Sequence, residues 1–245
     1  MPHISLAAEE IFKIGAFSVT NSLLTTWLMM AILTFVSLMA TSKISLIPRP
    51  IQSFVEMILE GFFSLFKSIN GEKTKMFFPL LATLFIYIIS ANWIGLLPGI
   101  GSIGIYKGEE AHRHFIPLLR GTTADLNTTL ALAITAVLAI QYYGIKTLGA
   151  KIYLKKFFDF NNPISFFLGP LEIVSEFAKI LSFAFRLFGN IFAGEVLLTV
   201  VAFLMPFFAP LPFIGLEFFV GMIQALVFSM LTAVFLNTAT RQAEH

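Results

Sequence analysis

The chain has 245 residues, of which 57% are hydrophobic and only 12% are charged, and its mean hydropathy is +0.86. This composition excludes an ordinary soluble domain and indicates a protein that crosses a membrane several times. A formal net charge of +2 is too small to favour a nucleic-acid partner, and the absence of cysteine excludes disulfides and thiolate metal sites.

Apolar stretches long enough to cross a bilayer predict five transmembrane helices within one integral membrane domain, residues 1–245. The expected spans are residues 17–41, 76–97, 122–147, 171–205 and 214–240. The fold class predicted from this pattern is therefore an all-α membrane protein.

Residues 51–69 differ from the spans on either side because one face is polar and the other is apolar. The apolar face is formed by Phe54, Ile58, Phe62 and Phe66, which recur at fourfold spacing. The polar side is formed by Gln52, Glu56, Glu60 and Lys67. We predict an amphipathic helix that lies along the membrane surface or packs on a partner. The alternative is a sixth span, which the charged residues disfavour.

The loop of residues 98–121 holds two histidines, His112 and His114, beside Glu109 and Glu110. Two histidines at this spacing could bind a metal. Solvated loop residues are the simpler interpretation, so no metal site is expected.

Polar residues also open the third span. Asp125 or Thr122 could cap the helix that follows. Asp125 and Asn127 could instead line a polar path into the membrane, and the sequence leaves both interpretations open.

The most informative stretch lies between Pro170 and Pro206. It is apolar enough for a membrane, yet it carries ionisable residues, which are costly inside a bilayer and indicate function. Its polar positions are Glu172, Glu176, Lys179, Arg186, Asn190 and Glu195. At about 100° per residue the first five share one stripe of a helix, whereas Glu195 lies on roughly the opposite face.

Arg186 is the strongest candidate in this stretch. It has apolar neighbours on both sides, and a guanidinium group cannot lose its charge inside a protein. Nothing adjacent in sequence offsets that charge, so we expect a partner from another chain.

A helix between the two prolines would measure about 50 Å, whereas the hydrocarbon core is about 30 Å thick. We therefore expect it to bend, protrude or tilt steeply.

The distribution of lysine and arginine predicts the orientation, because cytoplasmic loops are enriched in these residues. The basic residues cluster after the first span and before Pro170, which places the N-terminus outside and the C-terminus inside.

Glu217 and Gln224, seven residues apart, share one face of the last span. The polar groups then fall into an outer set of Asn92, Asp125, Asn127, Glu195 and Glu217, and an inner set of Glu172, Glu176, Lys179 and Ser182. Arg186 lies between the sets, so we expect a polar path from each side, interrupted by a fixed positive charge.

Several of these residues stand in motifs that resemble subunit a of the F-type ATP synthase. The motifs are Arg186-Leu187-Phe188-Gly189-Asn190 with Ala193-Gly194-Glu195, the stretch from Asn92 to Pro98, Ala124-Asp125-Leu126-Asn127, and Gln224-Ala225. They occur in the family's order, and the resemblance covers most of the chain from about residue 50.

The resemblance implies an ion-translocating stator subunit without cofactors or catalytic chemistry of its own. It implies two long, steeply tilted helices beside a rotating ring of c subunits, with two offset half-channels for protons or Na⁺. Arg186 matches the essential arginine that faces the ring carboxylate. Asn92, Asn190, Glu195 and Gln224 match the outer half-channel, Asp125 and Asn127 match it less closely, and Glu172 matches the inner acid. The implied partners are the c-ring, b-type peripheral stalk subunits and the lipid bilayer. The implied location is a bacterial plasma (inner) membrane, with an organellar inner membrane as the alternative.

The sequence also departs from the family's pattern. Glu217 stands where many bacterial members have histidine, so Glu195 and Glu217 would share the outer channel. Gly95 and Ile100 stand where some members carry acidic residues. These differences affect which side chains could carry protons through the outer half-channel.

Two other classes of membrane protein also carry buried charges. A secondary transporter or antiporter would also bury Arg, Glu and Asn, but it predicts internal repeats and broken helices, which the sequence lacks. A structural membrane subunit would pair its buried charges statically, and Glu176 with Lys179 could form such a pair. An enzyme is excluded because no nucleophile–base pattern is found.

Overall fold

The computed structural model describes residues 7–15, 17–42, 50–97, 99–100, 103–107, 114–155, 157, 163–206 and 208–241. Its five helical segments long and apolar enough to cross a membrane are Asn21–Thr41, Val55–Ile94, Leu126–Leu148, Phe167–Leu204 and Pro210–Ala239. This confirms an all-α membrane protein. His112, Glu109 and Glu110 lie outside the described residues, so the histidine loop stays untested.

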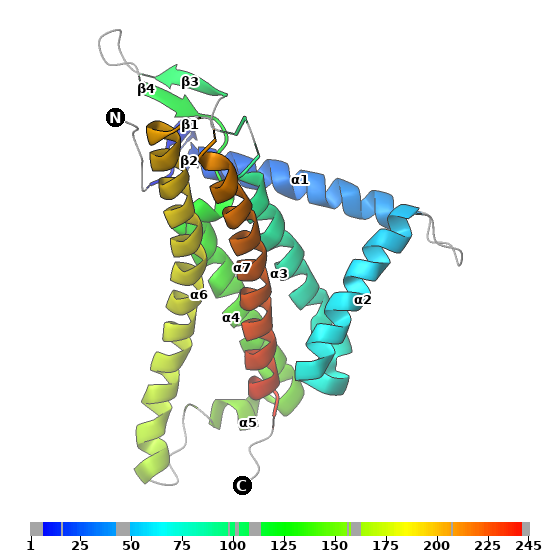
Figure 1. The fold of residues 1–245 in the computed structure, drawn as a ribbon. Coiled ribbons are helices and arrows are strands. Elements are labelled where there is room, and N and C mark those ends of the chain that lie inside the picture. The colour runs from blue at the N-terminus through cyan, green and yellow to red at the C-terminus, as the bar shows by residue number, and fades with distance from the viewer. Residues whose placement is uncertain are drawn as a thin grey trace.

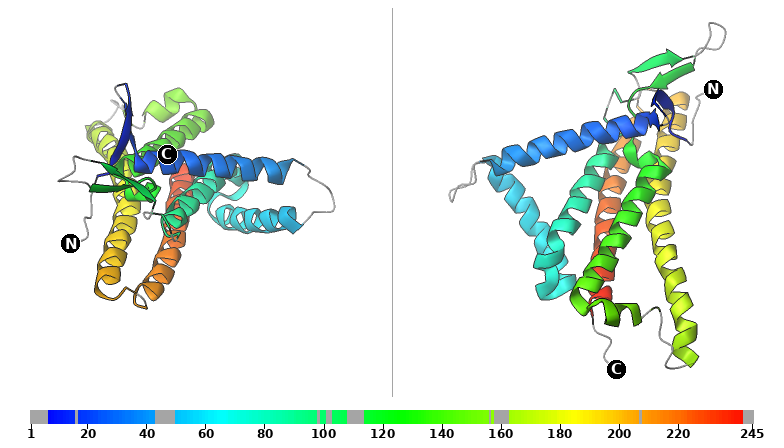
Figure 2. Two further views of the ribbon diagram at one scale, coloured as in Figure 1. Left: turned by 90° about the horizontal axis from the view of Figure 1, so that it is seen from above. Right: turned by 180° about the vertical axis from the view of Figure 1, so that it is seen from behind.

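The chain begins with a short antiparallel hairpin of β1 (Glu10–Ile14) and β2 (Phe17–Thr20), followed by α1 (Asn21–Thr41). The prediction that the first helix begins at residue 17 was wrong, because residues 17–20 pair with β1. The Thr20 hydroxyl accepts a hydrogen bond from the Leu23 backbone N–H and so caps the helix. Figures 1 and 2 show α1 crossing the hairpin end of the bundle and extending beyond it.

The amphipathic stretch forms α2 (Pro50–Asn70), which a 3₁₀ turn (Gly71–Lys73) joins to α3 (Thr74–Ile94). The predicted helix is confirmed, whereas its placement along the membrane surface stays a prediction. Figure 1 shows that the C-terminal end of α2 reaches the bundle beside α3 and α7. Phe66, near this end, is completely buried.

A second hairpin, β3 (Gly104–Lys107) and β4 (His114–Pro117), lies in the segment predicted to be a polar loop. A 3₁₀ turn (Thr122–Ala124) and α4 (Leu126–Leu148) follow, and then α5 (Ala150–Lys155). The third span therefore begins at residue 126 rather than 122. Asp125 is extended, and its side chain accepts a hydrogen bond from the Asn127 backbone N–H, which starts the helix.

The two last helices are α6 (Pro163–Leu204), with 42 residues, and α7 (Pro210–Ala239), with 30 residues. The expectation that Pro170 bounds the fourth span was wrong, because Pro170 lies inside α6. Prolines at the first helical positions suit α6 and α7, since that N–H has no intrahelical acceptor. At 1.5 Å per residue the helices measure about 63 and 45 Å, so both exceed a hydrocarbon core of about 30 Å.

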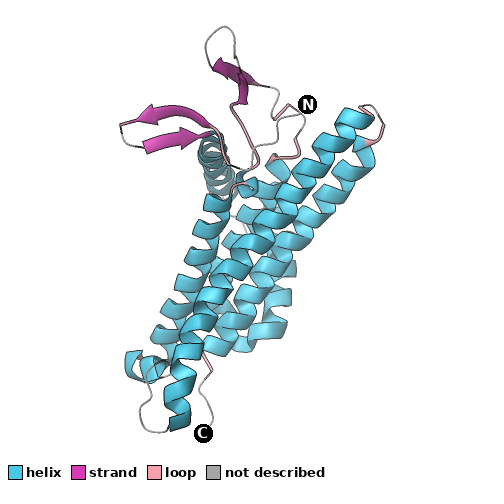
Figure 3. Cartoon of the chain, turned by 90° about the vertical axis from the view of Figure 1, so that its left-hand side faces the viewer, coloured by secondary structure: helices cyan, strands magenta, loops and turns pink. Residues whose placement is uncertain are grey.

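Helices α3, α4, α6 and α7 form the core of the bundle. Small residues at the crossings, including Ala133, Ala136 and Ala184, are completely buried and let the helices approach closely. Both hairpins lie at one end of this bundle, and α5 and the end of α7 lie at the other (Figures 1 and 3). The polar residues of α6 and α7 are therefore distributed between two ends.

Candidate functional site

Two cavities lie along α6 and α7. The larger, of about 990 Å³, is near the hairpins and is here called the hairpin-side cavity. Its polar and charged lining residues are Glu9, Glu10, Asn21, Asn92, Arg120, Glu195, Thr199 and Glu217. It collects side chains from the N-terminal segment, the loop before α4, α3, α6 and α7, so it is the more polar entrance to the bundle.

The smaller cavity, of about 280 Å³, lies further toward the C-terminal end of α7 and is here called the C-terminal-side cavity. It is lined by Ser175, Ala178, Lys179, Ser182, Phe183, Arg186, Leu231 and Phe235. Every one of these residues belongs to α6 or α7. The two cavities share no lining residue.

Asn190 and Gln224 lie between the cavities. The Asn190 Nδ2 donates a hydrogen bond of 2.8 Å to the Gln224 Oε1, which joins α6 to α7. Along α6 the C-terminal-side cavity ends at Arg186 and the hairpin-side cavity begins at Ile191. Gln224 is 4% exposed whereas Asn190 is exposed, so this part-buried bond lies between the two cavities with its α7 side inside the bundle.

Arg186 faces the C-terminal-side cavity and is half-buried. Its Nη2 donates a hydrogen bond of 3.1 Å to the Ser182 Oγ, one helical turn earlier. Among the described residues, no carboxylate forms an ion pair with Arg186. The sequence expectation that nothing adjacent offsets its charge therefore extends to the described fold.

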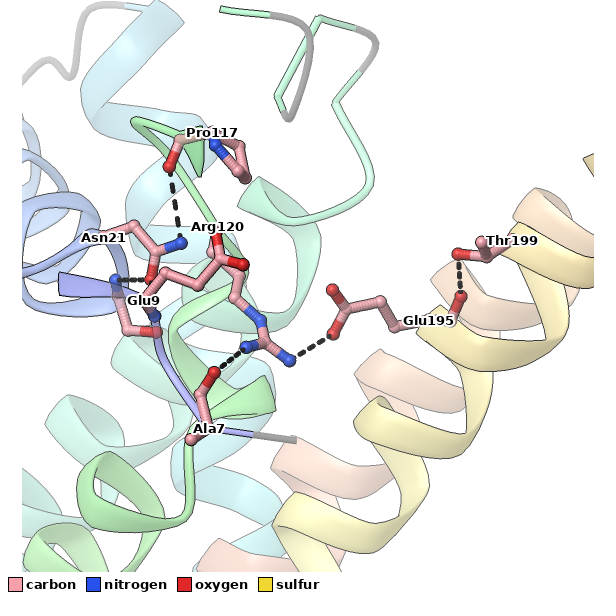
Figure 4. Close-up of polar contacts among 8 residues, drawn as sticks. Ala7, Glu9, Asn21, Pro117, Arg120, Glu195 and Thr199 are labelled. Carbon is pink, nitrogen blue, oxygen red and sulfur yellow. Dashed lines mark hydrogen bonds and ion pairs between the residues drawn. The ribbon is translucent and has the colours of Figure 1, made fainter. Parts of the chain in front are cut away.

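Glu195, on the opposite side of α6, belongs to the hairpin-side cavity. Its Oε2 lies 3.2 Å from the Arg120 Nη2, and the two side chains form an ion pair. The Arg120 Nη1 donates a hydrogen bond of 3.0 Å to the Ala7 carbonyl oxygen. Figure 4 shows the guanidinium group between Ala7 and Glu195, so it bridges the N-terminal segment and α6.

Glu217 reaches the same cavity from α7 and is 6% exposed. A Cβ atom built at Gly194 would overlap the Glu217 carboxyl group, so only glycine at position 194 leaves room for it. Glu217 makes no ion pair or hydrogen bond with the described part of the chain. Two acids from neighbouring helices, Glu195 and Glu217, thus share one cavity.

Asn92 fixes the wall of the hairpin-side cavity. Its Nδ2 donates a hydrogen bond of 2.8 Å to the Gly221 carbonyl of α7, and its Oδ1 accepts one of 2.8 Å from the Thr123 hydroxyl. A Cβ atom at Gly221 would lie 3.1 Å from the Asn92 Cβ, so the glycine permits this close approach. Asn92 is 2% exposed, and its hydrogen bonds tie α3 to α7 and to the turn before α4.

Asp125 and Asn127 line neither cavity. The Asp125 Oδ1 accepts hydrogen bonds from the Asn127 backbone N–H and from its Nδ2, at 3.0 and 3.2 Å. Asp125 therefore caps α4, whereas the polar path through Asp125 and Asn127 stays a prediction.

Glu176 and Lys179 form the pair that the sequence left open. The Lys179 Nζ lies 2.7 Å from the Glu176 Oε1 and 4.9 Å from the centre of the Phe235 ring. Glu172, one turn earlier on α6, lines neither cavity. Burial first, and then the negative charges of Glu176 and Glu172, raise the pKa of Tyr153 on α5 to about 12. Both acids therefore lie close to α5.

Sequence reasoning missed Arg120, Asn21 and Thr123 as site residues. They belong to short loops or helix ends, where polar residues are ordinary. Only the fold brings Asn21 and Arg120 to the cavity and Thr123 to Asn92 in its wall. One signal did exist: Glu195 lies opposite Arg186 and so needed another polar partner. Within the described part of the chain, no group of three or more His, Cys, Asp or Glu side chains is placed to hold a metal ion.

Comparison with known proteins matches these features to a family. The sequence profile of the family described as ATP synthase A chain matches residues 23–237. The chain is 36% identical over 227 residues to ATP synthase subunit a of Moorella thermoacetica, covering 93% of this chain and 94% of that protein. It is 31% identical over 234 residues to ATP synthase subunit a 2 of a Bradyrhizobium species, covering 96% and 95%. The chain therefore belongs to the ATP synthase A chain family.

Proposed function

We propose that this chain is the ion-translocating stator subunit of a rotary ATP synthase, and that its two cavities are half-channels opening on opposite sides of the membrane. One observation carries the proposal: two separate cavities follow the α6–α7 pair and are divided at the Asn190–Gln224 hydrogen bond. An ion that enters one cavity cannot pass directly into the other, so a second component must carry it across. The relatives named ATP synthase subunit a support this assignment.

The carrier is a carboxylate on a ring of c subunits that turns against α6. Large apolar side chains on α6 are exposed in the isolated chain, which suits a lipid and protein surface. They include Val174, Phe177, Leu181 and Phe185, at 63, 65, 51 and 52% exposure. Arg186 lies beside this surface without a carboxylate of its own among the described residues, so the ring supplies its counter-ion.

Arg186 separates the two half-channels electrostatically. A permanent cation favours the ionised form of a passing carboxylate, which therefore releases its proton before it crosses between channels. The same charge repels protons and hydronium and prevents a direct leak. Lysine is a poor substitute because it can lose its proton when desolvated.

The cavities supply different groups to this path. In the hairpin-side cavity Glu195 and Glu217 are the acids supplied by α6 and α7, and Asn92 positions the wall. In the C-terminal-side cavity Ser182 accepts a hydrogen bond from Arg186. Glu172 and Glu176 lie outside this cavity, nearer the N-terminus of α6. Asn190 and Gln224 lie between the two cavities. Asp125 caps α4, and a place for Asp125 and Asn127 on the path stays a prediction.

In this assignment the chain has no catalytic chemistry and no cofactor. It crosses a bacterial plasma membrane with its N-terminus outside and its C-terminus in the cytoplasm, and b-type peripheral stalk subunits hold it against the ring. The hairpin-side cavity then opens outward and the C-terminal-side cavity opens inward.

A secondary transporter is less well supported. Transporter sites are built from helices that break near the middle of the membrane. Here α6 and α7 run without interruption through Arg186 and Gln224. A static role for the charges accounts for Glu176 with Lys179, but it leaves Arg186 without an anionic partner in the part of the chain that the structure describes.

The test is proton flux in vesicles that carry the assembled complex, comparing wild type with Arg186→Ala. We expect ATP-driven pumping to be lost while the complex still assembles, and passive leak to rise. Lys151→Ala, which removes an exposed cation from α5, is the matched control and should pump normally. Normal pumping by Arg186→Ala would overturn the proposal.

A further inference from the structure

Arg120 is a buried cation outside the membrane-spanning helices. It is 7% exposed and lies just before the 3₁₀ turn that leads into α4. Its backbone N–H donates a hydrogen bond of 3.1 Å to the Thr25 hydroxyl of α1, and its guanidinium group contacts Ala7 and Glu195. The residue is thus fixed by α1 and by the N-terminal segment, and it reaches from a loop to α6 (Figure 4).

The two acids that α6 and α7 supply to the hairpin-side cavity have different surroundings. Glu195 has a guanidinium partner at 3.2 Å, and this contact holds the direction of its side chain. Glu217 instead packs against Gly194 and makes no ion pair with the described part of the chain. Of the two carboxylates on α6 and α7, one therefore has a cationic partner and the other has none among the described residues.

We propose that Arg120 is a positioning residue for ion translocation, which holds the Glu195 carboxylate at the wall of the hairpin-side cavity and supplies its counter-charge. Of the acids on α6 and α7 that line this cavity, Glu217 is then the one without a fixed cation among the described residues. This inference rests on the proposed function and extends its machinery to a loop residue.

The shape of the guanidinium group makes the proposal specific. Arg120 uses Nη1 for the Ala7 carbonyl and Nη2 for Glu195, so one planar group serves two partners at once. A lysine ammonium keeps the charge but has a single nitrogen. We therefore expect Arg120→Lys to retain part of the flux and Arg120→Gln to lose more of it.

The first experiment is a double-mutant cycle of Arg120→Gln and Glu195→Gln in the complete complex, measured as ATP-driven proton pumping per assembled complex. If Arg120 acts through Glu195, Arg120→Gln lowers the rate severalfold in the wild-type background and has no further effect in the Glu195→Gln background. Lys13→Gln is the matched control, since Lys13 is an exposed cation at the same end of the molecule. It should pump like wild type.

A second measurement does not depend on flux and decides the case in which Glu195→Gln is inactive. The chain contains no cysteine, so Glu195→Cys introduces a single thiol into it. We expect an anionic methanethiosulfonate to label this thiol faster, relative to a cationic one, when Arg120 is present. The ratio of the two rates should fall severalfold in Arg120→Gln and stay unchanged in Lys13→Gln.

Three results would overturn the inference: independent effects of the two substitutions in the cycle, a labelling ratio unaffected by Arg120→Gln, or a loss of assembled complex with normal flux in what remains. The last result would identify Arg120 as purely structural. Failure of the proposed function is recognised separately, because Arg186→Ala would then pump normally whatever Arg120 variants do.

Discussion

At the scale of single residues, the site depends on close approach between α6 and α7. Gly194 is buried in α6, and the Glu217 carboxyl group of α7 occupies the space where any other side chain would begin. In the sequence, Gly194 is only part of a motif. That it leaves room for an acid from the next helix is shown by the fold.

We predict that Gly194→Ala displaces the Glu217 carboxyl group and lowers ATP-driven proton pumping severalfold without loss of assembly. The added methyl group overlaps the end of a flexible side chain rather than backbone, so the helices can keep their packing. Pumping and the amount of assembled complex are measured together. Gly215→Ala is the control, because a Cβ atom at position 215 meets nothing within 4 Å. Equal pumping by both variants would show that the position of Glu217 does not matter.

The residues found from sequence and those missed differ for a physical reason. Arg186, Glu195 and Glu217 are ionisable groups in apolar helices. Burying such a group in a membrane is costly, so each one indicates a functional role from sequence alone. Arg120 is a basic loop residue, and such residues are mostly solvated. Only its contact with Glu195, 75 positions away, makes it part of the site. Long-range pairing of this kind leaves no periodic signal in one sequence.

At the scale of elements, helical periodicity predicted the long helices but not the short strands. The first helix was expected at residue 17, yet β2 occupies residues 17–20 because they pair with β1. The hairpin of β3 and β4 was hidden inside a predicted loop, since strands of four residues are too short for an alternating pattern to be recognised. Pro170 was read as a boundary, whereas α6 continues through it.

The sequence also did not predict the contact between α4 and α5. Tyr153 of α5 is 3% exposed, and its ring lies where a Cβ atom at Gly144 would be. Its hydroxyl group donates a hydrogen bond of 2.6 Å to the Gln141 Oε1. Tyr153 thereby anchors α5 beneath α4.

The raised pKa of Tyr153 predicts how this contact responds to alkaline pH. Burial and two nearby carboxylates raise that pKa from 10 to about 12, so the fold favours the neutral phenol. The corresponding stability is complete below pH 10 and is lost as pH rises from 10 to 12. Hydrogen exchange of α5 in the detergent-solubilised protein should accelerate over this range in wild type and less in Tyr153→Phe. Tyr142→Phe, at an exposed position, should behave like wild type. Identical pH profiles for wild type and Tyr153→Phe would contradict the prediction.

At the scale of the whole molecule, the helices of the bundle core, α3, α4, α6 and α7, run between two chemically different ends (Figure 1). The end with both hairpins contains the acid-lined cavity, and the end with α5 carries basic residues such as Lys146, Lys151 and Lys155 (Figure 1). An uneven distribution of lysine sets membrane orientation because cytoplasmic loops are enriched in it. The ends of the bundle should therefore face different compartments.

This asymmetry can be tested with cysteines placed at the two ends of the chain, which has none of its own. We predict that Lys107→Cys, on β3, reacts with a membrane-impermeant maleimide added outside intact cells, and that Lys151→Cys, on α5, reacts only in inverted vesicles. The parent chain provides the unlabelled baseline. Because both substitutions remove a lysine, they alter charge equally and differ only in location. Labelling of Lys151→Cys from outside intact cells would show that the orientation is the opposite of the predicted one. The acid-lined cavity would then open to the cytoplasm.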